Sequence, residues 1–184
     1  MSAQFSFLQA NINHCAGAQD LLLQSMAEWG IDLAVACEPY YVPPLPHWVG
    51  DSDGTVAVLA KSGTGPSISL VERGSGYVVV GWGEYVVVGT YFSPNRSLAE
   101  FEIYLGFVRS AVARQSPKPT VVLGDLNAKS RAWGNPATNP RGRAVQWYKA
   151  IGSKVLGSNP EADQQKVDLL IPVSQKAVNP APEL

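Results

Sequence analysis

Hydrophobic residues in this chain fall into short apolar runs that are separated by Gly, Pro, Ser and Asn. Runs rich in Val, Ile, Phe and Tyr predict β-strands, because β-branched and aromatic side chains fit a half-buried pleated surface. The predicted strands cover residues 5–12, 31–37, 54–60, 67–72, 77–82, 85–92, 120–124 and 167–171. Helical spacing of apolar positions predicts a helix over residues 16–29, and two more helices are predicted at 98–115, behind a capping Ser97, and at 144–151.

The order of these elements predicts a layered α/β domain whose two halves follow the same plan. In each half a helix leads into a buried strand, and that strand ends on an acid, Glu38 in the first half and Asp125 in the second. Two sheets packed face to face, with helices outside, would bring these two strand ends to one rim. The length of 184 residues suits one domain over residues 1–184.

Composition narrows the class of protein. Hydrophobic residues make up 46% of the chain and charged residues 16%, which favours a globular protein over a disordered one. A net charge of −1 gives no general basic surface, so any DNA contact needs a local patch. No signal-peptide pattern or membrane-spanning apolar stretch is present, and the two cysteines, Cys15 and Cys37, are interpreted as small buried hydrophobic residues. These features predict an intracellular protein in a reducing compartment.

The stretch Val-Val-Leu-Gly-Asp-Leu-Asn, residues 121–127, carries the strongest chemical signal. A strand that stops at this point places Asp125 and Asn127 on the same side, because side chains alternate with a period of two. A carboxylate can bind a metal or orient water, and an amide can hold a phosphate oxygen without adding negative charge. This pairing suits hydrolysis of a phosphate ester. Alternatively, the two residues simply cap the following loop, since both favour turns.

Polar groups end several of the predicted strands. They are found in Gln9-Ala10-Asn11, Cys37-Glu38-Pro39, Thr90-Tyr91-Phe92-Ser93-Pro94-Asn95, Gly124-Asp125-Leu126-Asn127 and Val167-Asp168. In this order they resemble the endonuclease/exonuclease/phosphatase superfamily, and most of all the apurinic-endonuclease-like endonuclease domain of non-LTR retrotransposons of the R1 type. The resemblance extends over residues 7–148. Its further motifs are Ala18-Gln19-Asp20-Leu21-Leu22, Trp29-Gly30-Ile31-Asp32, Glu38-Pro39-Tyr40, Asn127-Ala128-Lys129-Ser130-Arg131-Ala132-Trp133-Gly134 and Arg141-Gly142.

The resemblance implies a DNase I-like four-layer α/β (α+β) sandwich, in which helices flank two packed mixed β-sheets. It also implies a Mg²⁺- or Mn²⁺-dependent endonuclease that nicks double-stranded DNA and is normally fused to a reverse transcriptase, with a nuclear location. No membrane partner is implied, and the oligomeric state stays open. These are expectations from the motifs and do not follow from composition.

The resemblance also assigns roles to single residues. Glu38 is expected to ligate the metal, and Asn11 is expected to hold Glu38 and help position the metal or phosphate. Asp125 is expected to orient or deprotonate the attacking water, and Asn127 to bind the scissile phosphate. Tyr91 is expected to contact phosphate or stabilise developing charge. A core or rim position for Tyr91 and a turn role for Glu38 are the structural alternatives.

Five further residues receive less specific expectations. Asp168, which follows Val167, is expected to be a second strand-end acid of the catalytic group. A basic cluster follows the Gly-Asp-x-Asn segment, where a DNA backbone would pass, and is expected to contact phosphates. It consists of Lys129, Arg131, Arg141 and Arg143. The alternative for this cluster is ordinary solvated surface.

The resemblance is poor over residues 151–184. Members of the family close with Ser-Asp-His, whose histidine is central to catalysis, and this sequence has no Ser-Asp-His. The last strand of the fold is therefore expected to be missing. Three hypotheses for function follow: a metal-dependent DNA-nicking endonuclease domain, a weak or inactive relative that binds DNA or protein, and another phosphoesterase of the superfamily.

Overall fold

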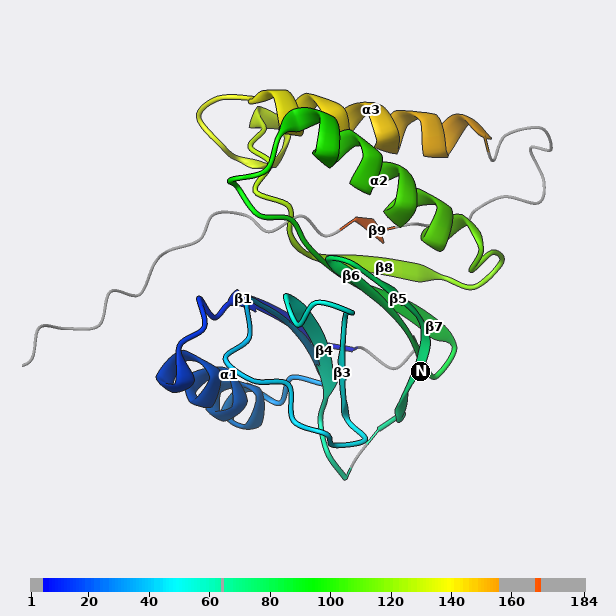
Figure 1. Cartoon of the computed structure of the whole chain (residues 1–184). Helices are drawn as coiled ribbons and strands as arrows, with labels where there is room; N and C mark the ends of the chain where they lie inside the picture. The colour runs from blue at the N-terminus through cyan, green and yellow to red at the C-terminus, as the bar shows by residue number, and fades with distance from the viewer. Residues whose placement is uncertain (1–4, 64, 156–167, 170–184) are drawn as a thin grey trace, which may run out of the picture.

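Two β-sheets pack face to face in the computed structural model, which describes residues 5–63, 65–155 and 168–169 (Figure 1). In spatial order, the first sheet contains β1 (Phe7–Asn11), β2 (Leu33–Cys37), β4 (Val56–Ala60) and β3 (Trp48–Gly50). The second sheet contains β5 (Ile68–Gly74), β6 (Tyr77–Trp82), β7 (Tyr85–Tyr91), β8 (Thr120–Asp125) and β9 (Asp168–Leu169). Both sheets combine parallel and antiparallel pairs.

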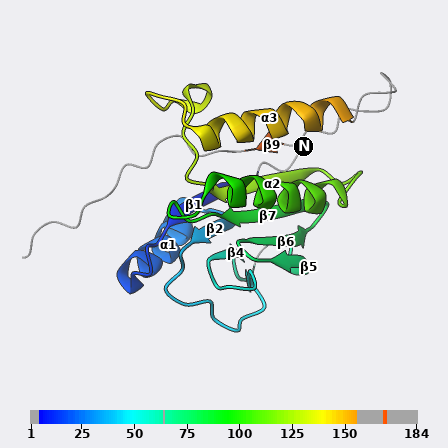
Figure 2. The same cartoon turned by 45° about the horizontal axis from the view of Figure 1, so that its top comes forward.

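Helices cover the outer faces of both sheets. Helix α1 (Ala16–Trp29) packs on the first sheet, whereas α2 (Leu98–Ala113) and α3 (Pro140–Val155) pack on the second. Helices α2 and α3 lie side by side, and the Tyr148 hydroxyl donates a hydrogen bond to the Glu102 carbonyl between them (Figures 1 and 2). A short 3-10 helix, η1 (Arg131–Trp133), precedes α3. The predicted pair of packed mixed sheets with flanking helices is confirmed.

Strand β2 shows how the apolar runs of the sequence produce this layered core. Leu33, Val35 and Cys37 face the interior between the two sheets, whereas Ala34 and Ala36 face α1. All five residues are buried, so the strand has no polar face to alternate with the apolar one. The small alanine side chains let α1 approach the sheet closely.

Helix ends follow the predicted signals closely in two cases and depart from them in a third. Gly30 ends α1 in the left-handed conformation at φ +65°. Ser97 begins α2 with a capping box, in which Ser97 and Glu100 each bond the other's backbone N–H. Helix α3 starts at Pro140, earlier than the predicted residue 144, because proline is well suited to the first helical position.

Two other features differ from the predictions. Strand β3 was not predicted, since it has only three residues and its apolar run is too short to stand out. Cys37 is buried as predicted, but Cys15 is exposed at the start of α1. Only Asp168 and Leu169 of the predicted strand 167–171 are described, and they form β9. No helix in the described part of the chain is long and apolar enough to cross a membrane.

Candidate active site

The carboxyl ends of β1 and β8 are joined across the two sheets by Gln9. Its side-chain Nε2 donates to the Gly124 carbonyl at 3.0 Å, and its Oε1 accepts from the Gly124 N–H at 2.7 Å. Gly124 has φ +143°, and a Cβ at this position would lie 1.8 Å from the Thr90 carbonyl oxygen. Only glycine fits this close approach. Gly124 therefore has a structural role, because it allows β8 to pass close to β7 just before Asp125.

Asp125 receives hydrogen bonds from two separate elements. The Asn11 Nδ2 at the end of β1 donates to Asp125 Oδ2 at 3.4 Å, and the Asn127 backbone N–H donates to Oδ1 at 2.8 Å. The side chain of Asn127 donates from Nδ2 to the Phe92 carbonyl at 3.0 Å. These contacts fix the plane of the Asp125 carboxylate and tie the Gly-Asp-x-Asn segment to the end of β7.

Glu38 and Tyr91 make the second contact across the rim. The Tyr91 hydroxyl donates to Glu38 Oε1 at 2.6 Å, and Tyr91 is the register neighbour of Asp125 in the parallel pair β7–β8. Burial, followed by this hydrogen bond to Glu38, raises the pKa of Tyr91. The hydroxyl therefore stays protonated at neutral pH and remains a donor that orients Glu38.

Left-handed backbone conformations gather at the same rim. Among the described residues, the non-glycine residues with positive φ are Asn13, His14, Glu38 and Asn127. Asn and His tolerate this conformation, but it is uncommon for a longer side chain such as Glu38. The Glu38 backbone is held by its N–H, which donates to the Thr55 carbonyl at 2.8 Å, and by its carbonyl, which accepts from His14 at 2.9 Å. Such held conformations are typical of functional sites.

His14 is a rim residue that the sequence analysis did not assign to the site. Its Nε2 lies 3.9 Å from Glu38 Oε1, and its Nδ1 lies 3.2 Å from the Pro39 carbonyl oxygen. The His14 side chain is 62% exposed, so it borders the site from the solvent side. Nothing in the sequence pointed to His14, which lies two residues after the predicted strand end at Ile12. The only histidine expected from the family motif lies near the C-terminus of the domain.

The oxygen donors at the rim suit a hard divalent cation. Glu38 and Asp125 supply carboxylates, and Asn11 supplies an amide oxygen that also accepts from the Asn13 N–H at 2.9 Å. Mg²⁺ is commonly held by one or two carboxylates, with waters and substrate phosphate completing its shell. No cluster of three or more His, Cys, Asp or Glu residues within the described ranges is placed to hold a metal by itself. The donor set therefore fits Mg²⁺ or Mn²⁺ together with a bound phosphate.

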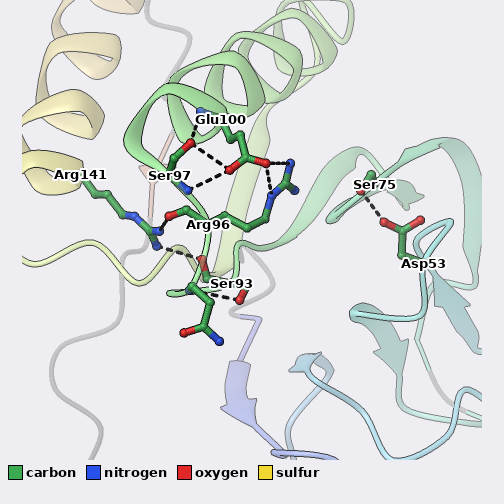
Figure 3. A network of polar contacts seen from close by, with 8 residues as sticks. Asp53, Ser75, Ser93, Arg96, Ser97, Glu100 and Arg141 are labelled. Carbon is green, nitrogen blue, oxygen red and sulfur yellow. Dashed lines mark hydrogen bonds and ion pairs between the residues drawn. The ribbon is translucent and has the colours of Figure 1, made fainter.

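Arg141 was predicted to contact DNA, and the structure corrects this. The residue is 8% exposed, and its guanidinium donates to the carbonyls of Ser93 and Arg96 (Figure 3). It also donates to the Pro94 carbonyl and lies over the Phe92 ring. It holds the segment between β7 and α2 in place and is not presented to solvent. Its neighbour Gly142 also has a structural role, because a Cβ there would lie 1.9 Å from the Lys129 carbonyl oxygen.

We expect Arg141→Lys to reduce the free energy of unfolding by about 2–3 kcal/mol. The planar guanidinium reaches three separate carbonyl oxygens, whereas the compact ammonium group of lysine cannot contact all three. Arg143→Lys on the same helix is the matched control, and its exposed position predicts a change below about 0.5 kcal/mol. Urea unfolding measures both values. Equal stability of the two variants would contradict the structural role of Arg141.

The other predicted basic residues lie on the surface. Lys129, Arg131 and Arg143 are exposed and follow Asp125 along the chain, so they stay candidates for phosphate contact. The backbone of Asp168 pairs with that of Val121, four positions before Asp125 in the parallel register, which corresponds to roughly 13 Å along the strand. The catalytic role of Asp168 stays a prediction.

No protein-family model and no curated protein sequence matches this chain. Solved structures do match it. The endonuclease domain of TRAS1, a telomere-specific non-LTR retrotransposon, aligns with a TM-score of 0.66 at 24% sequence identity, over 80% of this chain and 72% of that domain. The chain has the DNase I-like fold.

Two other proteins with the DNase I-like fold align over 80% of this chain and 71% of their own. An apurinic (AP) endonuclease from Archaeoglobus fulgidus has a TM-score of 0.56 at 13% identity. A 3′ phosphatase from Neisseria, NExo, whose structure contains a product DNA hairpin, has a TM-score of 0.54 at 15% identity. The fold predicted from the strand-end motifs is confirmed, and nucleases and phosphatases are both among the proteins that share it.

Proposed function

We propose that this chain is a cation-dependent phosphodiesterase that nicks double-stranded DNA, of the kind found in non-LTR retrotransposon endonuclease domains. One observation carries the proposal. Residues from both sheets meet at one rim, where Asn11 contacts Asp125 and Tyr91 contacts Glu38. The loop-cap alternative for Asp125 does not account for the hydrogen bond that Asn11 donates from the other sheet.

Asp125 is the group best placed to act on water. Its two oxygens already accept hydrogen bonds from Asn11 and from the Asn127 backbone, so its orientation is set before substrate binds. In the proposed step Asp125 orients a water molecule and takes its proton as the water oxygen attacks phosphorus. The bond from phosphorus to the leaving oxygen then breaks, and that oxygen takes up a proton from solvent.

Glu38 and Asn11 would hold the divalent cation, and the negative charge of the nearby Asp125 carboxylate would strengthen its binding. When bound, Mg²⁺ or Mn²⁺ neutralises charge on the phosphate oxygens. Tyr91 keeps Glu38 oriented through its 2.6 Å hydrogen bond. The Asn127 amide group has two N–H donors and uses one on the Phe92 carbonyl, so its geometry supports the predicted contact of the second with a phosphate oxygen.

The phosphate backbone of the substrate would extend over the loop that follows Asp125. Lys129, Arg131 and Arg143 are exposed on this loop and at the start of α3. Buried Ser130 fixes the loop, because its hydroxyl accepts hydrogen bonds from the Ala132 N–H and from Gln146 Nε2. A fixed basic loop can position a duplex without reading its sequence.

A second candidate function is DNA binding with little or no catalysis. Residues 1–184 contain no Ser-Asp-His, the motif that supplies the catalytic histidine in the family that the sequence resembles, so a chain of these residues alone is expected to catalyse weakly. His14 borders Glu38 but comes from a different element and follows a different motif.

Supercoiled plasmid distinguishes the two candidates. The proposed endonuclease converts it slowly to the open circular form in Mg²⁺ and not in EDTA, whereas the binding protein retards it in a gel and leaves it supercoiled. Open circles that form equally in EDTA would contradict cation-dependent hydrolysis.

A further inference from the structure

Two adjacent tyrosines beside the rim are exposed although their backbone is held firmly. Tyr40 and Tyr41 follow Glu38-Pro39, and their exposed fractions are 61% and 57%. Large exposed aromatic side chains are costly in water, so a pair of them next to a candidate active site calls for a partner that covers their faces.

One buried side chain holds the backbone of this pair. Gln19 on α1 is 9% exposed, and its Oε1 accepts from the N–H groups of Tyr40 at 2.9 Å and of Tyr41 at 3.2 Å. Its Nε2 donates to the Tyr41 carbonyl at 2.8 Å. These contacts tie the backbone of Tyr40 and Tyr41, in the light-blue connection that follows β2 in Figure 1, to α1. The two rings are therefore presented on a rigid support and lose little freedom when a partner covers them.

The segment that carries the pair has no acidic side chain of its own to repel a polyanion. From Pro39 to Gly50 the chain has no acidic residue, and four prolines stiffen the segment: Pro39, Pro43, Pro44 and Pro46. The exposed apolar side chains Ile103 and Phe107 on α2 differ in this respect, because Glu100 and Glu102 lie beside them and would repel phosphates.

The distance from Glu38 matches a few nucleotides. Consecutive Cα atoms are about 3.8 Å apart, so the Tyr41 Cα lies within roughly 11 Å of that of Glu38. One DNA strand advances about 3.4 Å per nucleotide, so this reach covers about three nucleotides on one side of a phosphate held at Glu38.

We propose that Tyr40 and Tyr41 form a stacking surface for unpaired DNA bases next to the phosphate at Glu38. The inference rests on the proposed function and adds a preference to it: DNA with a few unpaired bases at this position binds more tightly than a perfect duplex. Base–aromatic stacking does not depend on base identity, so the preference concerns pairing state and not sequence.

Base stacking can be followed with 2-aminopurine, whose fluorescence falls when it stacks. The two probes are DNA duplexes of identical sequence, one fully paired and one with three unpaired bases that include 2-aminopurine. Binding is measured in EDTA, so that cleavage plays no part. The variants are Tyr40→Ala and Tyr41→Ala, with Tyr40→Phe and Tyr41→Phe as matched controls that keep the ring. Trp29→Ala, at the far end of α1 and 66% exposed in the parent chain, controls for the loss of any exposed aromatic.

We expect the unsubstituted chain to quench the unpaired probe and to bind it more tightly than the paired one. Each alanine variant should weaken that binding about 10-fold and restore fluorescence, whereas the phenylalanine variants and Trp29→Ala should behave as the parent. Alanine variants that quench and bind as the parent would overturn the stacking surface alone. A parent chain that binds neither probe would overturn it together with the proposed function. Tyrosine-dependent quenching by a chain that never nicks plasmid would support the surface and contradict the nuclease.

Discussion

A chain extended beyond Leu184 by a family-like segment with Ser-Asp-His should nick supercoiled plasmid about 10²- to 10⁴-fold faster than the chain of 184 residues. The physical reason is that, in the proposed mechanism, Asn11, Glu38, Asp125 and Asn127 would supply groups for cation, water and phosphate, while residues 1–184 contain no histidine of the family motif. Residues of a catalytic unit act together, so one absent member lowers the rate by orders of magnitude.

The control is the same extension with alanine in place of the histidine, which keeps any added strand but removes the imidazole. Rates follow from the conversion of supercoiled to open circular plasmid in Mg²⁺. If the extended chain and the chain of 184 residues nick at the same rate, the histidine is not needed, and the mechanism inferred from the family motif is wrong.

Asp125→Asn in the extended chain should lower nicking by at least about 10³-fold. The amide keeps the size of the side chain and can still accept the hydrogen bond from the Asn127 N–H, but it cannot take a proton from water. Far-UV circular dichroism should be unchanged, because the substitution leaves the packing of β8 intact.

A remote acid tests whether this loss is specific to the rim. Glu28→Gln removes one carboxylate from the exposed far end of α1, and its nicking rate should equal that of the parent. Asp125→Asn with an undiminished rate would show that another group activates the water.

Much of the fold could be predicted because its signals are local. The unbroken apolar runs of β2 and β8 reflect burial on two faces, and Gly30 and Ser97 mark helix ends through their own backbone chemistry. Strand β3 was missed because three residues carry little periodicity, and it depends on pairing with β4 for its formation.

The composition of the rim could be predicted in part for the same reason. Strand ends with polar groups are visible in the sequence, so Asn11, Glu38 and Asp125 were expected at one rim. Asn11 was expected to hold Glu38, whereas its amide donates to Asp125 and the Tyr91 hydroxyl donates to Glu38. The role of Gln9 was not expected, because its bonds to Gly124 depend on how the two sheets dock.

Arg141 was misassigned because a basic residue after an active loop has the same local signal whether it faces solvent or folds inward. Its three carbonyl partners lie between Ser93 and Arg96, more than forty residues earlier in the chain. His14 was overlooked because a left-handed turn, which no short motif announces, brings it beside Glu38.

Titration of the protein with Mn²⁺ tests most directly whether the rim is a single cation site. Binding is detected by calorimetry and by the loss of the electron paramagnetic resonance signal of free Mn²⁺. We predict that the chain of 184 residues binds Mn²⁺, that Glu38→Gln and Asp125→Asn each weaken binding about 10-fold or more, and that Glu28→Gln does not. Equal affinity of the parent, Glu38→Gln and Asp125→Asn would contradict the cation site at this rim.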